Sequence, residues 1–301
     1  MARYDNGNGD GLHACPVGLV PMGWPDPTDD LDGFLRQVEK LGYAGIQFGD
    51  PGPEPAAIRE RFQAHGVELA ERYFPIRCTV DGPAPDALEE GIAHLGHVRD
   101  LGGRMLVAAI DGSPDRDGFA GRAVDAPGLT SGGWRDLLAL LDVLATRAVD
   151  AGVDVTFHPH AGTYVETPDE TDRLLEYTDP ERVGLCLDTG HWIVGGGDPI
   201  AAIGAYGPRL RHLHLKNVDG DILAGLRDGV VGGLTAAVEQ VVFGPLDRGV
   251  LPLTAFVDHL GASGYRGWLM VEQDSFVGGH VEAAAGNRAA LATALDEHSH
   301  E

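Results

Sequence analysis

Two histidines end an apolar run in the stretch FHPHAGTYVETPDETDRL, residues 157–174, and their type and spacing suit metal or substrate binding. A β-strand alternates its side chains between two faces, so His158 and His160 point the same way. Pro159 cannot continue a sheet ladder, so we expect the hydrogen-bonded strand to end here. Two imidazoles would therefore project together from the end of a strand.

Three later apolar runs end in residues of the same chemical kind. The segment LDTGH contains Asp188 and His191, HLHLKN contains His214 and Lys216, and VEQD contains Glu272. Imidazoles and carboxylates from four strand ends would make a mixed nitrogen and oxygen site, which suits Mn²⁺, Co²⁺ or Zn²⁺. Structural alternatives exist for each residue, because Asp188 could cap a turn, Glu272 could lie at a rim and Lys216 could be a solvated charge.

Such a site needs a fold that brings the four strand ends to one place. Short β-type runs alternate with longer helical patterns along the whole chain, without a break in composition. The eight runs are 17–23, 43–50, 67–75, 104–111, 153–160, 183–191, 210–218 and 267–274. Strands that alternate with helices in this way pair in parallel through crossover connections.

Eight such units in 301 residues predict a single-domain α/β fold, a closed (β/α)₈ TIM barrel over residues 13–301, after a disordered tail at residues 1–12. The alternative is an open doubly wound sheet, which would need a glycine-rich phosphate turn after an early strand. The segment GLVPMGWPDP has no G-x-G-x-x-G pattern, so the barrel is favoured. Barrels carry their active sites at the C-terminal ends of the strands, and we expect the metal site at those ends of strands five to eight.

The charge balance limits the classes of partner. The chain has 22 Lys and Arg residues against 46 Asp and Glu residues, a formal net charge of −24, so neither nucleic acid nor an anionic membrane surface is an expected partner. The sequence shows no secretory signal and no apolar run of about 20 residues, so we expect a cytoplasmic protein. Three cysteines without close spacing do not predict a disulfide framework. Homo-oligomer and partner-subunit arrangements both stay open.

At its strand ends the sequence resembles the xylose isomerase-like superfamily of TIM-barrel sugar isomerases and epimerases. The resemblance covers most of the chain and is carried by VPMGW (20–24), HPHAGTYVET (158–167), TDPERVGLCLDTGH (178–191), RLRHLHLKNV (209–218) and GYRGWLMVEQD (264–274). Within the superfamily, the combination of HPHAGT, TDPERVGL and GWLMVEQD is most similar to the inosose dehydratases, which act on 2-keto-myo-inositol.

The resemblance implies one divalent metal ion bound by one residue from each of strands five to eight. The ligands implied here are His158, Asp188, His214 and Glu272. We expect Mn²⁺, with Co²⁺ or Zn²⁺ as alternatives. Many isomerase and epimerase relatives have Glu where this chain has His158, and the neutral ligand favours the dehydratase branch.

The expected substrate is a small polyol or keto-sugar. The substrate-facing residues that we expect are His160, His191, Lys216, Trp24 and Gln47. For catalysis, Lys216 or His191 would serve as the base that removes a proton next to a ketone. His160 would assist departure of the hydroxyl group.

Two positions depart from the dehydratase pattern, and we expect both to lie near the substrate. Asn217 stands where the dehydratases usually have Asp after HLK, and the loop VVFGPLDRGVLPL (241–253) has Asp247, Arg248 and Gly249 in place of an acidic or glycine-rich run. A relative acting on another cyclic or sugar ketone is therefore an alternative substrate assignment.

The expected activity is that of a metal-dependent lyase that dehydrates a keto-inositol or a similar ketone through an enediolate. The alternatives are a sugar or inosose isomerase or epimerase, and a C-glycoside-cleaving lyase subunit that works with a partner. The superfamily also includes endonuclease IV-type enzymes, but the net charge of −24 argues against a DNA substrate.

Overall fold

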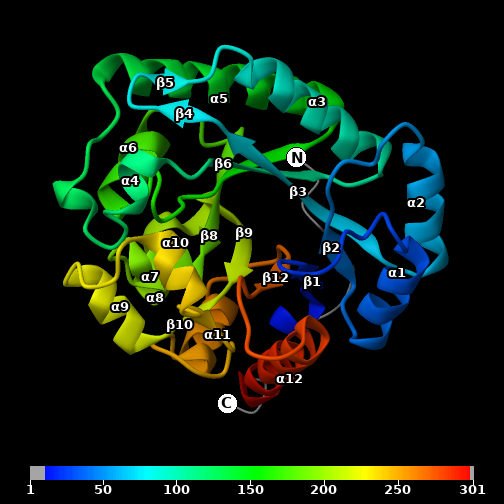
Figure 1. Ribbon diagram of the computed structural model, residues 1–301. Coiled ribbons are helices and arrows are strands. Elements are labelled where there is room, and N and C mark those ends of the chain that lie inside the picture. The colour runs from blue at the N-terminus through cyan, green and yellow to red at the C-terminus, as the bar shows by residue number, and fades with distance from the viewer. Residues whose placement is uncertain (1–10, 299–301) are drawn as a thin grey trace.

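The computed structural model describes residues 11–298, and its centre is a closed barrel of parallel strands (Figure 1). The barrel strands are β1 (Val17–Val20), β2 (Gly45–Gln47), β3 (Glu68–Ile76), β6 (Met105–Ile110), β7 (Asp154–Phe157), β8 (Val183–Asp188), β9 (Leu210–Leu215) and β12 (Leu269–Glu272). Their order around the barrel is β1-β12-β9-β8-β7-β6-β3-β2, and β1 pairs with both β12 and β2 to close it. The predicted TIM barrel is confirmed, and each of the eight predicted runs coincides with one barrel strand, although β3 extends one residue beyond its run.

Helices follow the strands and surround the barrel (Figure 1). The larger ones are α1 (Leu31–Lys40), α2 (Pro55–Ala64), α3 (Ala87–Asp100), α5 (Ser131–Ala151), α6 (Pro168–Glu176), α8 (Pro199–Tyr206), α11 (Leu253–Ala262) and α12 (His280–His298). Helix α6 shows why the polar turn after β7 ends in a helix. The Thr167 side chain accepts a hydrogen bond from the Glu170 backbone N–H, and the Glu170 side chain accepts one from the Thr167 N–H.

Several short elements are not separate units of the predicted strand and helix pattern. They are the helices α4 (Pro114–Asp117), α7 (Thr189–Val194), α9 (Gly220–Arg227) and α10 (Leu234–Glu239), the hairpin β4 (Cys78–Thr79) with β5 (Gly82–Pro83), and the pair β10 (Asn217–Val218) with β11 (Phe243–Gly244). Elements of two to eight residues carry too little periodicity to be recognised in a sequence. Three of them, α7, β10 and β11, lie beside the site described below.

The strand ends are positioned by a continuous apolar layer between the barrel and the helices. It includes Ile46, Phe74, Leu185 and Leu213, which are all fully buried on the outer faces of their strands. Inside the barrel, Cys186 packs in a smaller cluster with Met105 and Val107. Cys15, Cys78 and Cys186 are free.

The ends of the chain bear on the predicted tail. Residues 1–10 of the predicted disordered segment 1–12 lie outside the described residues, whereas Leu12 belongs to the short 3-10 helix η1 (Leu12–Ala14) and is fully buried. Within residues 11–298, every helix is too short or too polar to span a lipid bilayer.

Candidate metal and substrate site

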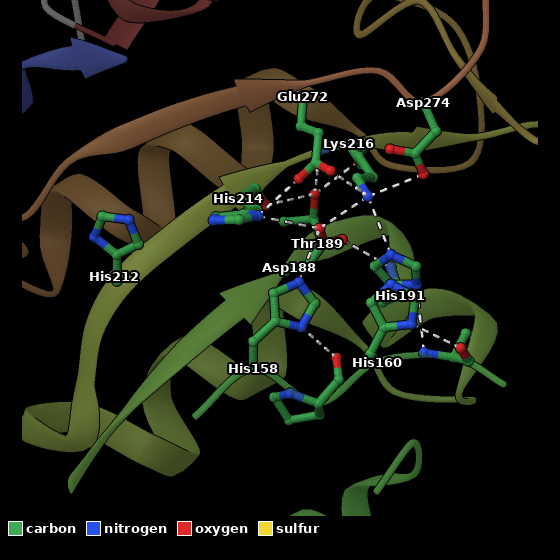
Figure 2. Close-up of polar contacts among 12 residues, drawn as sticks. His158, His160, Asp188, Thr189, His191, His212, His214, Lys216, Glu272 and Asp274 are labelled. Carbon is green, nitrogen blue, oxygen red and sulfur yellow. Dashed lines mark hydrogen bonds and ion pairs between the residues drawn. The ribbon is translucent and has the colours of Figure 1, made fainter. Parts of the chain in front are cut away.

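The four predicted metal ligands meet at the C-terminal ends of β7, β8, β9 and β12 (Figure 2). His158 Nε2 lies 3.6 Å from Asp188 Oδ2, and His214 Nδ1 lies 3.8 Å from the same oxygen. His214 Nδ1 also lies 2.7 Å from Glu272 Oε2. All four side chains are buried. The structure therefore brings together residues that are up to 114 positions apart in the sequence, from His158 to Glu272.

Asp188 combines a structural role with an unsatisfied oxygen. Its Oδ1 accepts a hydrogen bond from the His191 backbone N–H at 2.8 Å and begins helix α7. Its Oδ2 is buried and has no hydrogen-bond partner among the described residues. Ligand atoms of His158, Asp188 and His214 all lie within 4.8 Å of one another. A buried carboxylate oxygen that makes no hydrogen bond, facing two imidazole nitrogens at 3.6 and 3.8 Å and the Lys216 ammonium at 3.4 Å, fits a divalent cation.

Lys216, which could have been a solvated charge, is instead only 2% exposed and lies among acidic groups. Its Nζ lies 3.0 Å from Glu272 Oε1, 3.1 Å from Asp274 Oδ2 and 3.4 Å from Asp188 Oδ2. It also lies 3.0 Å from His191 Nε2 (Figure 2). The ammonium group therefore contacts both the carboxylates at the barrel mouth and His191.

Helix α7 approaches the end of β9 closely, and a glycine makes this possible. A Cβ atom on Gly190 would lie 2.6 Å from Lys216 Cβ and 3.0 Å from the Phe243 ring. The Lys216 Nζ lies 4.8 Å from the centre of that ring. The TGH sequence after Asp188 thus lets the helix that carries His191 pack directly against Lys216.

His160 and His191 form a stacked pair beside the carboxylates. Their ring centres lie 3.6 Å apart, and the His191 ring also contacts Phe243 at 4.8 Å between centres. His160 Nδ1 lies 2.8 Å from the Ala161 carbonyl oxygen, which assigns the proton to Nδ1 and leaves Nε2 as an acceptor. His191 Nδ1 accepts from the Ala161 N–H at 3.3 Å.

Burial and neighbouring charges shift the pKa values at the site in opposite directions. Burial would raise the pKa of both carboxyls, but Lys216 holds that of Asp188 well below its usual range and lowers that of Glu272 to about 2. Burial would lower the pKa of Lys216, but Asp188 raises it well above the usual lysine value. Burial lowers the pKa of His191 well below its usual range and that of His160 to about 3. In this arrangement Lys216 is charged and both histidines are neutral.

Three residues of the site region were not predicted as site residues. Asp274 contacts Lys216, and burial raises its pKa to about 7. Glu71 and His212 lie inside the barrel, and both side chains are 0% exposed. They contact each other through Glu71 Oε2 and His212 Nε2. The alternation in VELAERYFP gives the one signal for Glu71, because it places a carboxylate in the middle of an apolar strand.

Trp24 follows β1, and Gln47 ends β2. Across residues 11–298, no hydrogen bond, ion pair or ring contact joins either of them to the histidines and carboxylates described above. The Trp24 ring packs against Phe34 at 5.5 Å and against His280 at 4.5 Å between centres. Their roles in substrate binding stay predictions.

The Asn217 side chain organises a loop. Its Nδ2 donates to the carbonyl oxygens of Leu246 and Leu251, and its Oδ1 accepts from the backbone N–H groups of Val218 and Leu251. Asn217 is buried with all of these groups satisfied. This departure from the dehydratase pattern therefore shapes the loop after β11, next to Lys216.

Comparisons with known proteins agree with the barrel. Rhizopine catabolism protein MocC from Rhizobium meliloti is 34% identical over 271 residues, covering 87% of this chain and 82% of that protein. Inosose dehydratase from Geobacillus thermodenitrificans is 29% identical over 267 residues, covering 86% and 89%. The solved structure of an L-ribulose 3-epimerase shares the fold with a TM-score of 0.74 at 18% identity, covering 95% of this chain and 96% of the epimerase.

A known protein family also matches most of the chain. The family described as xylose isomerase-like TIM barrel matches residues 35–294, which include the ends of all strands that carry the site. The chain belongs to the xylose isomerase-like TIM barrel family.

Proposed function

We propose that the chain is a metal-dependent lyase that dehydrates a keto-inositol (inosose) or a similar cyclic or sugar ketone. The observation that carries the proposal is the cluster of His158, Asp188 and His214, whose ligand atoms lie within 4.8 Å around a buried oxygen that makes no hydrogen bond. Membership in a family of sugar-processing barrels and similarity to an inosose dehydratase support this reaction class.

His158, Asp188, His214 and Glu272 would hold the ion, and Mn²⁺, Co²⁺ or Zn²⁺ suits this mixture of imidazole and carboxylate ligands. When bound, such an ion acts as a Lewis acid that polarises a ketone and makes the neighbouring C–H group more acidic. The site is buried, so the charges around the reacting atoms are screened only weakly by water.

Hydrogen-bond accounting separates the roles of Lys216 and His191. An ammonium group has three protons, and Lys216 Nζ has acceptors at Glu272, Asp274 and His191 Nε2. Lys216 as an ammonium group can only donate, whereas the neutral His191 ring has one acceptor nitrogen. The Ala161 N–H approaches this ring at Nδ1, and Lys216 approaches it at Nε2. We propose that His191 takes the proton next to the ketone. Lys216 stabilises negative charge on the substrate and supplies a proton to the departing hydroxyl group.

His160 faces the same space with a different role. Its Nδ1–H is used by the Ala161 carbonyl, so Nε2 is available to accept a hydrogen bond from a substrate hydroxyl. With no proton on Nε2, His160 does not suit the role in hydroxyl departure that we expect from the sequence, and we propose instead that it orients the polyol so that the C–H bond to be broken faces His191. Its place in the ring stack with His191 fixes the orientation of both imidazoles.

The decisive test is the metal content and turnover of the wild type and of Asp188→Ala and Glu272→Ala. We expect about one divalent ion per wild-type chain, little metal in either variant, and a loss of turnover of about 10³-fold or more. Asp198→Ala is the matched control, because Asp198 also caps a helix but lies on the surface, so only about 1 kcal/mol of stability should be lost. Full turnover by metal-free Asp188→Ala would refute the proposal.

The substrate assay should include 2-keto-inositols, a rhizopine and a small panel of ketoses, because the relatives named above differ in what their names say of them. Incubation in deuterated water separates the reaction types. Loss of water with a new enone or dione absorbance supports dehydration. Exchange of hydrogen at carbon without loss of water would instead identify an isomerase or epimerase.

A further inference from the structure

A second cluster of buried polar groups lies inside the barrel, next to the proposed metal ligands. Glu71 on β3 faces β9, and the two strands are separated by β8, β7 and β6 on one side and by β12, β1 and β2 on the other. The Glu71 carboxylate therefore reaches across the barrel interior. Its Oε2 contacts His214 Nε2 at 2.9 Å and also contacts His212 Nε2, and all three side chains are at most 2% exposed.

This contact distinguishes the two ring nitrogens of His214. Nδ1 faces the site, where Glu272 Oε2 lies at 2.7 Å and Asp188 Oδ2 at 3.8 Å. Nε2 faces Glu71. Both nitrogens face a carboxylate, so the protein without metal can hold a proton on each of them. An ion bound on the Nδ1 side would take the place of the proton there, and Glu71 would keep the other proton on Nε2. The lone pair of His214 is then on Nδ1, the nitrogen that points to the proposed ion.

Glu71 is itself held in place. His212, two residues before His214 on the same inward face of β9, contacts the same carboxylate oxygen. The reaction proposed above uses neither Glu71 nor His212. Burying a carboxylate and two imidazoles away from water is unfavourable unless they form hydrogen bonds with one another. A metal-binding histidine commonly donates its second N–H to a carboxylate, which fixes its orientation and tautomer.

We propose that Glu71 is a positioning residue, which rests on the metal site proposed above: it accepts the Nε2–H of His214 and thereby directs the Nδ1 lone pair at the divalent ion, while His212 holds the carboxylate in that orientation. Glu71 touches neither the ion nor the substrate in this arrangement. Its contribution is to metal affinity, through the tautomer and ring orientation of His214.

The test measures Co²⁺ affinity by visible absorption in metal-stripped full-length protein, for the wild type, Glu71→Gln and Glu71→Met. Removing a partner of this kind weakens metal binding by about 10- to 100-fold, so we expect a Kd about tenfold higher for Glu71→Gln and up to about 100-fold higher for Glu71→Met. At saturating metal, kcat should change much less than Kd.

Glu166→Gln is the matched control for loss of a buried carboxylate. Glu166 is also 0% exposed, but its oxygens accept from the backbone N–H groups of Gly121 and Gly162 and contact no proposed ligand. We expect lower stability with an unchanged Co²⁺ Kd. An equal loss of affinity in Glu166→Gln and Glu71→Gln would overturn the proposal, because the effect would then come from general destabilisation.

The remaining outcomes separate this proposal from the proposed function. Wild-type protein that binds no divalent ion would remove the metal site itself. The same Co²⁺ Kd in the wild type and in folded Glu71→Gln and Glu71→Met would overturn the role of Glu71 alone. Two ions per chain would also overturn it, because Glu71, His212 and His214 could then be ligands of the second ion. If neither variant folds, ¹⁵N spectra of the Zn²⁺-loaded wild type decide: a proton on His214 Nε2 supports the proposal, and a proton on Nδ1 overturns it.

Discussion

Lys216 is the charge that compensates three buried carboxylates. Its Nζ lies within 3.4 Å of oxygen atoms of Asp188, Glu272 and Asp274. Burying several negative charges together is unfavourable unless a cation is close. In protein without metal, Lys216 is the cation that lies against all three carboxylates. A bound divalent ion would share that task with it.

Lys216→Met should therefore make stability depend on metal. Breaking a buried ion pair costs about 3–5 kcal/mol, so we expect a loss of this order in urea unfolding with a chelator present and a smaller loss with saturating Mn²⁺. Lys40→Met is the matched control, because Lys40 is exposed at the end of α1, and its replacement should change stability by less than about 0.5 kcal/mol. An equal loss of stability in Lys216→Met with and without Mn²⁺ would show that Lys216 and the metal ion do not compensate the same carboxylates.

At the scale of elements, one side chain holds the loop after β11 beside the site. Asn217 Nδ2 donates to two carbonyl oxygens, those of Leu246 and Leu251. The Leu246 backbone N–H donates to Asn287 Oδ1 on α12. Asn287 Nδ2 in turn donates to Gln273 Oε1, which follows β12. The ends of β9 and β12, which carry proposed ligands, are thus connected by polar contacts through this loop.

Asn217→Asp should break this connection, because a carboxylate cannot donate to the two carbonyls. Leaving a buried acceptor unsatisfied costs about 1–3 kcal/mol, so we expect about 2–4 kcal/mol less stability in urea unfolding and a higher KM. Asp247→Asn is the converse isosteric change at an exposed position of the same loop and should be nearly neutral. A variant Asn217→Asp as stable as the wild type would show that the loop does not depend on these hydrogen bonds.

The sequence predicts the elements whose pattern is local and misses contacts that cross the barrel. Strand alternation and strand order were enough to predict the barrel and to bring His158 and Glu272 to one end of it. Glu71 was missed because its partners lie on the opposite strand, and no spacing along the chain encodes that contact. The place of Asn217 directly after HLK predicts a position near the substrate, whereas its hydrogen bonds to a loop 29 and 34 residues later have no sequence signature.

At the scale of the whole molecule, the site occupies one side of the barrel mouth. The strands that carry the proposed ligands, β7, β8, β9 and β12, are consecutive in the barrel order. The long loops after β6 and β7 join on the same side, where Glu166 accepts hydrogen bonds at 2.8 Å from the N–H groups of both Gly121 and Gly162. The hydrogen bonds that join the two loops at the barrel mouth therefore depend on Glu166, a fully buried carboxyl group.

The pH dependence of unfolding should report on Glu166. Burial raises the pKa of Glu166 to about 7, although the two N–H groups and Arg116 act in the other direction and Glu170 adds to the increase. Between its unfolded pKa of 4.5 and about 7, the folded state binds more protons, so this contribution to stability is complete below about pH 4.5 and is lost as the pH rises through about 7.

The Gln side chain in Glu166→Gln does not titrate, so the difference in stability between the wild type and this variant isolates the contribution of the Glu166 carboxyl group. Each pKa unit corresponds to about 1.4 kcal/mol, so the unfolding free energy of the wild type relative to Glu166→Gln should fall by about 2 kcal/mol from pH ~5 to pH ~8. Urea unfolding of both proteins at several pH values measures this difference. A difference that stays constant or rises with pH would mean that the two backbone N–H groups and Arg116 outweigh burial, and that Glu166 joins the loops as an ionised carboxylate throughout this range.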